Sequence, residues 1–110
     1  MTVHIRKTYR GINPEMLYDE VRDLLQKHGV TAGDARLQTY AVPSGATQSR
    51  VTTVLRTGNK KECGNAHILG LPTGEAKVTI DLDESLVSKE SVTALQEDMD
   101  FILDSYEVKW

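Results

Sequence analysis

The chain has 110 residues, a formal net charge of −3 and a hydrophobic content of 39%, which are typical of one soluble globular domain over residues 1–110. No apolar run approaches the roughly 18–20 residues that cross a bilayer, and no such stretch opens the chain, so we expect neither a membrane partner nor a signal peptide. Cys63 is the only cysteine, which excludes an internal disulfide and favours a reducing, cytoplasmic location.

A strand is predicted first, because residues 2–10 alternate between two sides. One side carries Val3, Ile5 and Lys7, and the other carries His4, Arg6, Thr8 and Arg10. A helix is predicted next. Asn13 can cap this helix and Pro14 suits its first position, while Gly29 can end it in the left-handed conformation. An apolar stripe at helical spacing joins the two ends and consists of Leu17, Val21, Leu24 and His28.

Four further strands are predicted as two hairpins. The first hairpin runs from Arg36 to Arg56 around a turn at Pro43-Ser44-Gly45. The side that we expect to face the helices carries Leu37, Thr39, Ala41, Val51, Thr53 and Leu55. The opposite side carries Gln38, Tyr40, Val42, Arg50, Thr52, Val54 and Arg56.

The second hairpin turns at residues 71–74, and its last strand has the clearest alternation in the chain. Its inward side consists of Ala76, Val78, Ile80 and Leu82, and its outward side of Lys77, Thr79 and Asp81. The strand before the turn, residues 65–70, is apolar on both sides. Its orientation therefore stays open.

A final helix is predicted from Ser88 to the end of the chain. Its core stripe consists of Val92, Leu95, Met99, Ile102, Leu103 and Tyr106. Roughly opposite this stripe, Ala94, Phe101 and Val108 recur every seven residues. Phe101, the only phenylalanine, thus faces away from the predicted sheet. We expect a second subunit to cover it or, within the chain, the first helix or Trp110.

The order β-α-β-β-β-β-α predicts an α+β fold of two layers, in which an antiparallel sheet packs against a long C-terminal helix. With its opening Ile12-Asn13-Pro14-Glu15-Met16-Leu17-Tyr18-Asp19, this order resembles the helix-grip family of lipid and hormone carriers, polyketide cyclases and pollen allergens, without the insert that usually follows the first helix. It also resembles, as a single copy, the unit repeated in the TATA-box-binding protein. The first resemblance implies a ligand between sheet and last helix. The second implies that the basic side of this sheet corresponds to the side that meets DNA.

The first functional hypothesis is a non-enzymatic binding domain that holds a small apolar ligand between the sheet and the last helix. The side chains expected to line this site are Val78, Ile80, Met99, Ile102 and Tyr106. The alternative is a filled core without a ligand, because packed protein interiors seldom leave voids.

The second hypothesis is binding of nucleic acid or another polyanion by the outer sheet face. The candidate contacts are Arg6, Arg10, Arg50, Arg56 and Lys77, with Asp81 the one acid placed among them. A basic face of this kind is the electrostatic feature of anion binders. Tyr40 is the only aromatic residue placed there, so the face lacks a stacking platform for single strands and nucleic acid is the less favoured partner. The alternative is an ordinary solvated sheet face.

The third hypothesis is a structural subunit that forms a homo-oligomer. The expected contacts on the last helix are Phe101, Ala94 and Val108. Assembly through the sheet is the other possibility, because Tyr40, Val42 and Val54 make part of its outer side apolar.

Catalytic motifs are missing from the sequence. It has no phosphate-binding glycine loop, no Gly-x-Ser-x-Gly and no His-Glu-x-x-His. An enzyme is therefore the least favoured class, and we expect no cofactor. Cys63 and His67 come nearest to zinc-ligand spacing, but two further ligands are not evident nearby, so we expect no metal site.

Overall fold

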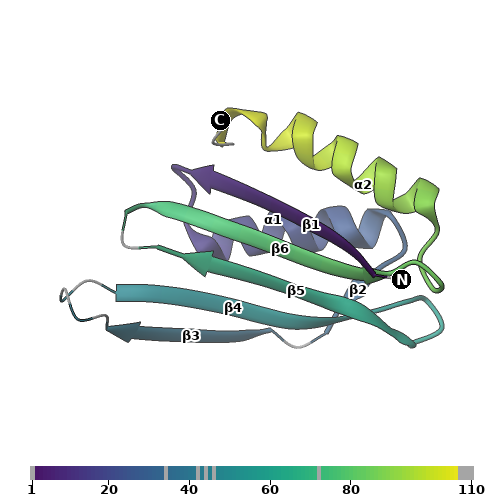
Figure 1. Ribbon diagram of the computed structural model, residues 1–110, viewed down its shortest axis with the longest axis horizontal. Coiled ribbons are helices and arrows are strands. Elements are labelled where there is room, and N and C mark those ends of the chain that lie inside the picture. Colours follow the sequence, from purple (N-terminus) through teal and green to yellow (C-terminus); the bar gives the residue numbers. More distant parts are fainter. Residues whose placement is uncertain are drawn as a thin grey trace.

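Two helices and an antiparallel sheet form the two layers of the computed structural model (Figure 1), which describes residues 2–33, 35–41, 43, 45, 47–71 and 73–106. Over these ranges the elements in chain order are β1 (Thr2–Arg10), α1 (Pro14–Lys27), β2 (Thr31–Ala32), β3 (Arg36–Ala41), β4 (Thr47–Arg56), β5 (Glu62–Gly70), β6 (Glu75–Asp83), α2 (Lys89–Ile102) and the 3₁₀ turn η1 (Asp104–Tyr106). The predicted α+β class and the packing of a C-terminal helix on the sheet are confirmed.

The strands follow the order β1-β6-β5-β4, and β2 and β3 both pair with the remaining edge of β4. All of these pairs are antiparallel. Both predicted hairpins are therefore present. The two-residue strand β2 is an addition to the predicted order, and it lies beside the end of β4, where Thr31 is opposite Arg56.

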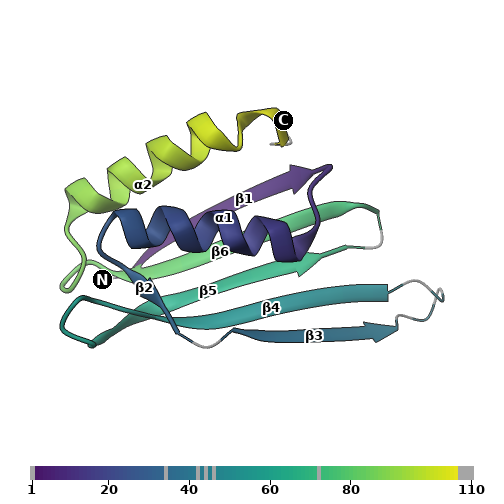
Figure 2. The ribbon, with the colours of Figure 1, turned by 180° about the vertical axis from the view of Figure 1, so that it is seen from behind.

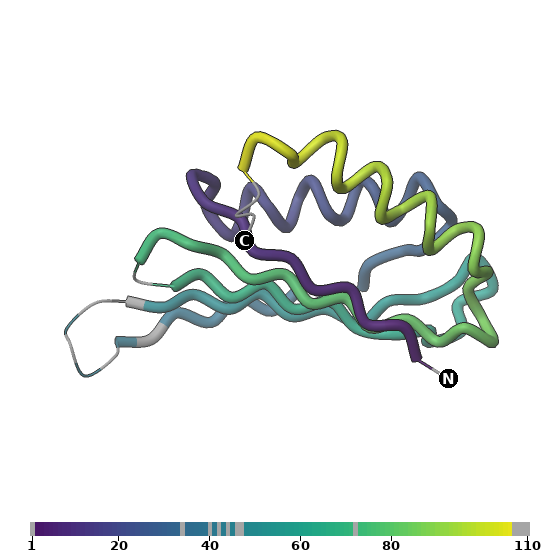
Figure 3. The backbone as a smooth tube through the Cα atoms, turned by 45° about the horizontal axis from the view of Figure 1, so that its top comes forward, coloured from purple at the N-terminus to yellow at the C-terminus, as the bar shows by residue number. Residues whose placement is uncertain are grey.

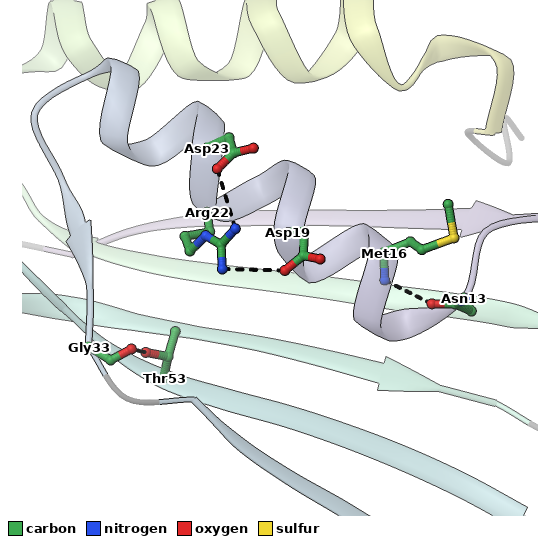
Figure 4. A network of polar contacts seen from close by, with 7 residues as sticks. All are labelled: Asn13, Met16, Asp19, Arg22, Asp23, Gly33 and Thr53. Carbon is green, nitrogen blue, oxygen red and sulfur yellow. Dashed lines mark hydrogen bonds and ion pairs between the residues drawn. The ribbon is translucent and has the colours of Figure 1, made fainter.

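Both helices lie on the same face of the sheet, as the views from behind and from the tilted direction show (Figures 2 and 3). The predicted start of α1 is confirmed, because Oδ1 of Asn13 accepts a hydrogen bond from the backbone N–H of Met16 at 2.8 Å (Figure 4). The helix ends just before Gly29, whose φ of 81° is the predicted left-handed conformation. Its buried side chains are Leu17, Val21, Leu24 and Leu25.

The last helix starts as predicted but ends earlier than predicted. Ser88 caps α2 by accepting a hydrogen bond from the N–H of Ser91, and the helix stops at Ile102. The last turn of α2 contributes no basic residue of its own, and its Asp100 pairs with Nζ of Lys7 on β1 at 2.9 Å. After Ile102 the chain continues as the tighter turn η1.

This early end overturns part of the predicted core stripe of α2. Val92, Leu95, Met99 and Leu103 are buried. Ile102 and Tyr106, in contrast, are 43% and 38% exposed. Ile102 is exposed because it lies at the edge of the buried stripe, about 60° from Met99 on a helical wheel. Tyr106 is exposed because it lies in η1, beyond the last turn of α2, where the helical spacing no longer applies.

The core lies between the helices and the inner face of the sheet. The inward residues predicted for β4 and β6 are confirmed, and the buried ones are Val51, Thr53, Leu55, Ala76, Val78, Ile80 and Leu82. The inward residues predicted for β3 are the exception. Leu37 shares the inner side with its partner Val51, yet it is 51% exposed, and Thr39 and Ala41 are exposed as well. The reason is that β3 lies at the sheet edge, away from both helices (Figure 2).

The structure also settles the orientation of β5. Ala66 and Ile68 point into the core, and His67 points outward. Cys63 is buried as well, three residues before Ala66, because the register shifts at a bulge where β5 pairs with Leu55 and Arg56. The predicted strand therefore starts earlier and includes Cys63.

Candidate anion-binding surface

The outer face of the sheet, which no helix covers (Figure 3), is organised by the register of its strands. Cross-strand pairing aligns one row of outward side chains across the strands: Arg6, Thr79, His67, Thr52 and Arg36. The neighbouring row, two residues along each strand, consists of Thr8, Lys77, Leu69, Arg50 and Gln38. We call these ten residues the basic band.

The basic band holds four side chains with a fixed positive charge, Arg6, Arg36, Arg50 and Lys77, and no carboxylate. All four are exposed. Within the described part of the chain, no ion pair joins any of them to an acid. Their donors are therefore available to an anion from solution.

Beside the band, charged residues on the same face occur in neutralising pairs. Arg10 donates a hydrogen bond to Glu75 at 2.8 Å, and His4 contacts Asp81 across the same two strands. Glu75 is thus a second acid on this face, in addition to the predicted Asp81. These pairs bound the basic band along β1 and β6 on either side.

Two open grooves meet on the outer face at His67, one over β4 and the other over β5. The larger groove, of about 470 Å³, lies between Arg36 and Arg56 and reaches Asn65 and His67. The second groove, of about 350 Å³, lies between Arg50 and Lys77 and reaches His67 and Leu69. The part of β5 at His67 and Leu69 therefore forms a floor with basic side chains on both sides. At Asn65, by contrast, the cations of the larger groove come only from β3 and β4, and the cross-strand partner on β6 is Asp81.

Arg56 lines the larger groove from outside the band. Its guanidinium lies against Gly33, where a Cβ would come within 2.9 Å of Nη1, so a larger residue there would displace it. Gly33 is itself held to β4: its N–H donates to the carbonyl of Val54 at 2.8 Å, and its carbonyl accepts a hydrogen bond from Oγ1 of Thr53 at 3.1 Å (Figure 4).

The structure thus brings together some of the sequence candidates for anion binding. Arg6, Arg50 and Lys77 lie in the band, Arg56 lines its larger groove, and Arg10 is paired with Glu75. Sequence reasoning missed Arg36 and His67. Arg36 could have been predicted, because it lies two residues before Gln38 and therefore points to the same, outward side of its strand. The outward position of His67 could not have been predicted, because its strand is apolar on both sides.

The candidates for an apolar ligand site do not form one wall. Val78, Ile80 and Met99 are at most 1% exposed within the core, whereas Ile102 and Tyr106 face solvent. The grooves of the basic band involve none of these five residues.

The candidates for assembly are only partly described. Phe101 is 86% exposed, so within the described residues α1 does not cover it. Ala94 is half-buried. Val108 and Trp110 lie outside the described residues, as does Val42 on the sheet, and the side chain of Tyr40 is not described.

The histidine and cysteine weighed as zinc ligands lie on opposite faces of the sheet. Cys63 is buried in the inner face and His67 is exposed on the outer face. Burial raises the pKa of the Cys63 thiol, which keeps the sulfur protonated and weakens it as a nucleophile or ligand.

The acidic side chains gather in the helical layer. α2 carries Glu90, Glu97, Asp98 and Asp100 against the single base Lys89. Asp98 accepts a hydrogen bond from Nε2 of His28 at 2.6 Å, and Lys27 lies 3.5 Å away. These two partners, His28 first, lower the pKa of Asp98. The basic band and the acidic helix therefore lie on opposite sides of the molecule.

Comparison with known protein families, curated proteins and solved structures finds no match to this chain. Among the residues that the structure describes, neither helix combines the length and hydropathy that crossing a bilayer would require.

Proposed function

We propose that this chain is a non-enzymatic binding domain that holds an extended polyanion on the outer face of its sheet, nucleic acid being one member of that class. The observation that carries the proposal is the basic band, with four cations and no acid among ten side chains. Guanidinium and ammonium groups form their strongest hydrogen bonds with anionic acceptors such as phosphate and carboxylate.

The neighbouring ion pairs argue against an ordinary solvated face. Opposite charges on adjacent strands stabilise a sheet, and this face uses that arrangement at Arg10 with Glu75 and at His4 with Asp81. The basic band lacks any such pairing. Clustering like charges costs stability unless an anion offsets their repulsion, which favours a binding role.

An apolar ligand between sheet and helix is less well supported. Ile80 and Met99 are 0% exposed and belong to one core cluster, as expected for a filled core. A site for a small ligand needs a cavity of roughly 300 Å³ or more. The described grooves of that size in the sheet are open to the outer face and basic.

Fluorescence anisotropy with labelled duplex DNA, single-stranded DNA and a sulfated polysaccharide, each at about 50 and 200 mM salt, tests the proposal. We expect binding to all three, with an affinity for duplex that falls with salt by a log–log slope of about 0.9 per phosphate contact. Arg50→Gln should weaken binding and reduce that slope by about 1.

The matched control is Arg22→Gln on α1, where Arg22 already pairs with Asp19 and Asp23 (Figure 4). This variant should bind like the wild type. Absent binding, or binding that salt does not weaken, would overturn the proposal. An equal loss in both variants would show that net charge, and not the band, determines binding.

A further inference from the structure

The cations of the basic band lie symmetrically about β5. In one row, Arg50 and Lys77 are the two cross-strand partners of Leu69. In the next row, Arg36 and Arg6 lie two strands away from His67 on either side. With strands about 4.8 Å apart, the first pair of backbones is separated by roughly 10 Å and the second by roughly 19 Å.

This symmetry restricts the shape of the polyanion. A ligand lying along β5 meets positive charge on both flanks, so a matching ligand is narrow and displays anionic groups on both of its sides. Single-stranded nucleic acid places phosphates on one side and bases on the other, and it relies on aromatic stacking. The outward residues of the floor are Asn65, His67 and Leu69, so the imidazole of His67 is the one aromatic ring among them, and they include no Phe, Tyr or Trp on which successive bases could stack.

Hydrogen-bonding capacity restricts the chemistry further. The four charged side chains of the band only donate, and its acceptors are neutral groups on Thr8, Thr52, Thr79, Gln38 and His67, with no carboxylate among them. An extended acidic peptide would bring backbone N–H groups that need acceptors. A linear chain of condensed phosphates brings acceptors alone, on both flanks and at every unit.

Resting on the proposed function, we infer that the polyanion is a linear condensed phosphate lying along β5, between Arg50 and Arg36 on one flank and Lys77 and Arg6 on the other. The site ends beyond Asn65. There a further groove of about 290 Å³ is lined by Glu62, Asp81 and Asp83, whose charge repels a phosphate chain.

Isothermal titration of the full chain with linear polyphosphate of about 15 units tests the inference. The comparison ligands are a single-stranded oligonucleotide and polyglutamate of equal charge number at the same salt concentration. We expect polyphosphate to bind at least about tenfold more tightly than either, a difference of about 1.4 kcal/mol.

Variants on the two flanks sharpen the test. Because the ligand meets both flanks, Arg50→Gln and Lys77→Gln should each weaken polyphosphate binding, by factors that agree within about threefold. Arg10→Gln is the control on the same face, since Arg10 is occupied by Glu75, and it should change the affinity less than about twofold. Thermal unfolding of Arg50→Gln and Lys77→Gln should match the wild type, because these side chains are exposed, and Arg10→Gln should show only the small loss expected from an exposed ion pair.

Each outcome is decisive. If the oligonucleotide binds as tightly as polyphosphate, or only one flank variant loses affinity, this inference fails while the proposed function stands. Tighter binding of polyglutamate would identify an acidic peptide as the ligand class and would also overturn it. If no polyanion binds, both proposals fail.

Discussion

The two faces of this sheet are built from the same strands but depend on different information in the sequence. On the inner face, residues such as Val78 and Ile80 recur at every second position of one strand and pack under the helices. On the outer face, the four cations of the basic band come from four different strands, and they gather only because the register aligns them. The core thus follows from local pattern, whereas the candidate site follows from pairing between distant segments.

Register connects the two faces physically. A one-residue slip of β5 against β4 would turn Ile68 outward and His67 inward. Burial of Ile68 therefore requires His67 to point outward, and His67 is the central residue of its row in the basic band. Assembly of the outer face is in this sense a consequence of the core.

The largest expected effect tests the difference between the faces at two neighbouring residues. Ile80→Ala should lower the free energy of unfolding by about 2–5 kcal/mol, because it removes fully buried methylene groups and leaves a cavity. Thr79→Ala on the outer face should cost well under about 1 kcal/mol. Urea denaturation measures both. Comparable losses at the two positions would mean that the outer face is also covered, and the comparison would break.

Much of the fold could be predicted from the sequence because the strongest local signals agree with the tertiary structure. β4 and β6 alternate cleanly, Asn13 caps α1 as expected, α2 starts at Ser88 as expected, and Gly29 ends α1. The end of α2 at Ile102 could not be predicted, because the apolar spacing continues past it and residues 103–106 include neither the glycine nor the proline that commonly marks a helix end.

The candidate site was predictable only in part. Arg50 and Lys77 lie on strands whose alternation assigns them outward. His67 lies between Ala66 and Ile68 and is followed by Leu69, so hydropathy alone gives the strand no preferred side. The bulge at Cys63 then changes the phase of burial within β5, which no period-two pattern can express.

A second prediction concerns the layer that covers the inner face. Asn13→Ala removes the side chain that caps α1, and it should lower the free energy of unfolding by about 0.5–2 kcal/mol. Anion binding at the outer face should not change at temperatures where the variant is folded. Denaturant unfolding and the anisotropy assay measure the two quantities, and an unchanged unfolding midpoint would contradict the role of Asn13 as a cap.

A third prediction compares two arginines on the outer face. Arg10→Gln breaks the exposed pair with Glu75 and should cost about 0.2–1 kcal/mol. Arg50→Gln breaks no ion pair among the described residues and removes like-charge repulsion, so stability should stay within about 0.5 kcal/mol of the wild type or rise. Thermal unfolding at low salt gives both values. A marked loss in Arg50→Gln would indicate a structural role for the band.

A fourth prediction uses pH to probe the acidic layer. The pKa of Asp98 is lowered in the folded state, by His28 first and by Lys27. Its contribution to stability is therefore complete above the unfolded pKa of about 3.9 and is lost as the pH falls through the lowered folded value. Asp98→Asn should be less stable than the wild type near pH 5, and the difference should shrink steadily in acid. Unfolding measured from pH 6 to pH 2 tests this. A stability difference that grows in acid would mean that the pKa of Asp98 is raised, and not lowered, in the folded state.

The smallest expected effect is at Phe101, the most exposed of the large apolar side chains in the described part of the chain. Because its side chain is 86% exposed, Phe101→Glu should change the free energy of unfolding by less than about 0.5 kcal/mol. Light scattering on the same samples separates the structural possibilities. A variant that is as stable as the wild type but smaller would show that Phe101 joins two copies of the chain, through the helical layer and away from the basic band. A variant that loses stability at unchanged size would mean that another part of the same chain covers Phe101. In that case α2 would make apolar contacts on two sides, with the core and with that covering segment.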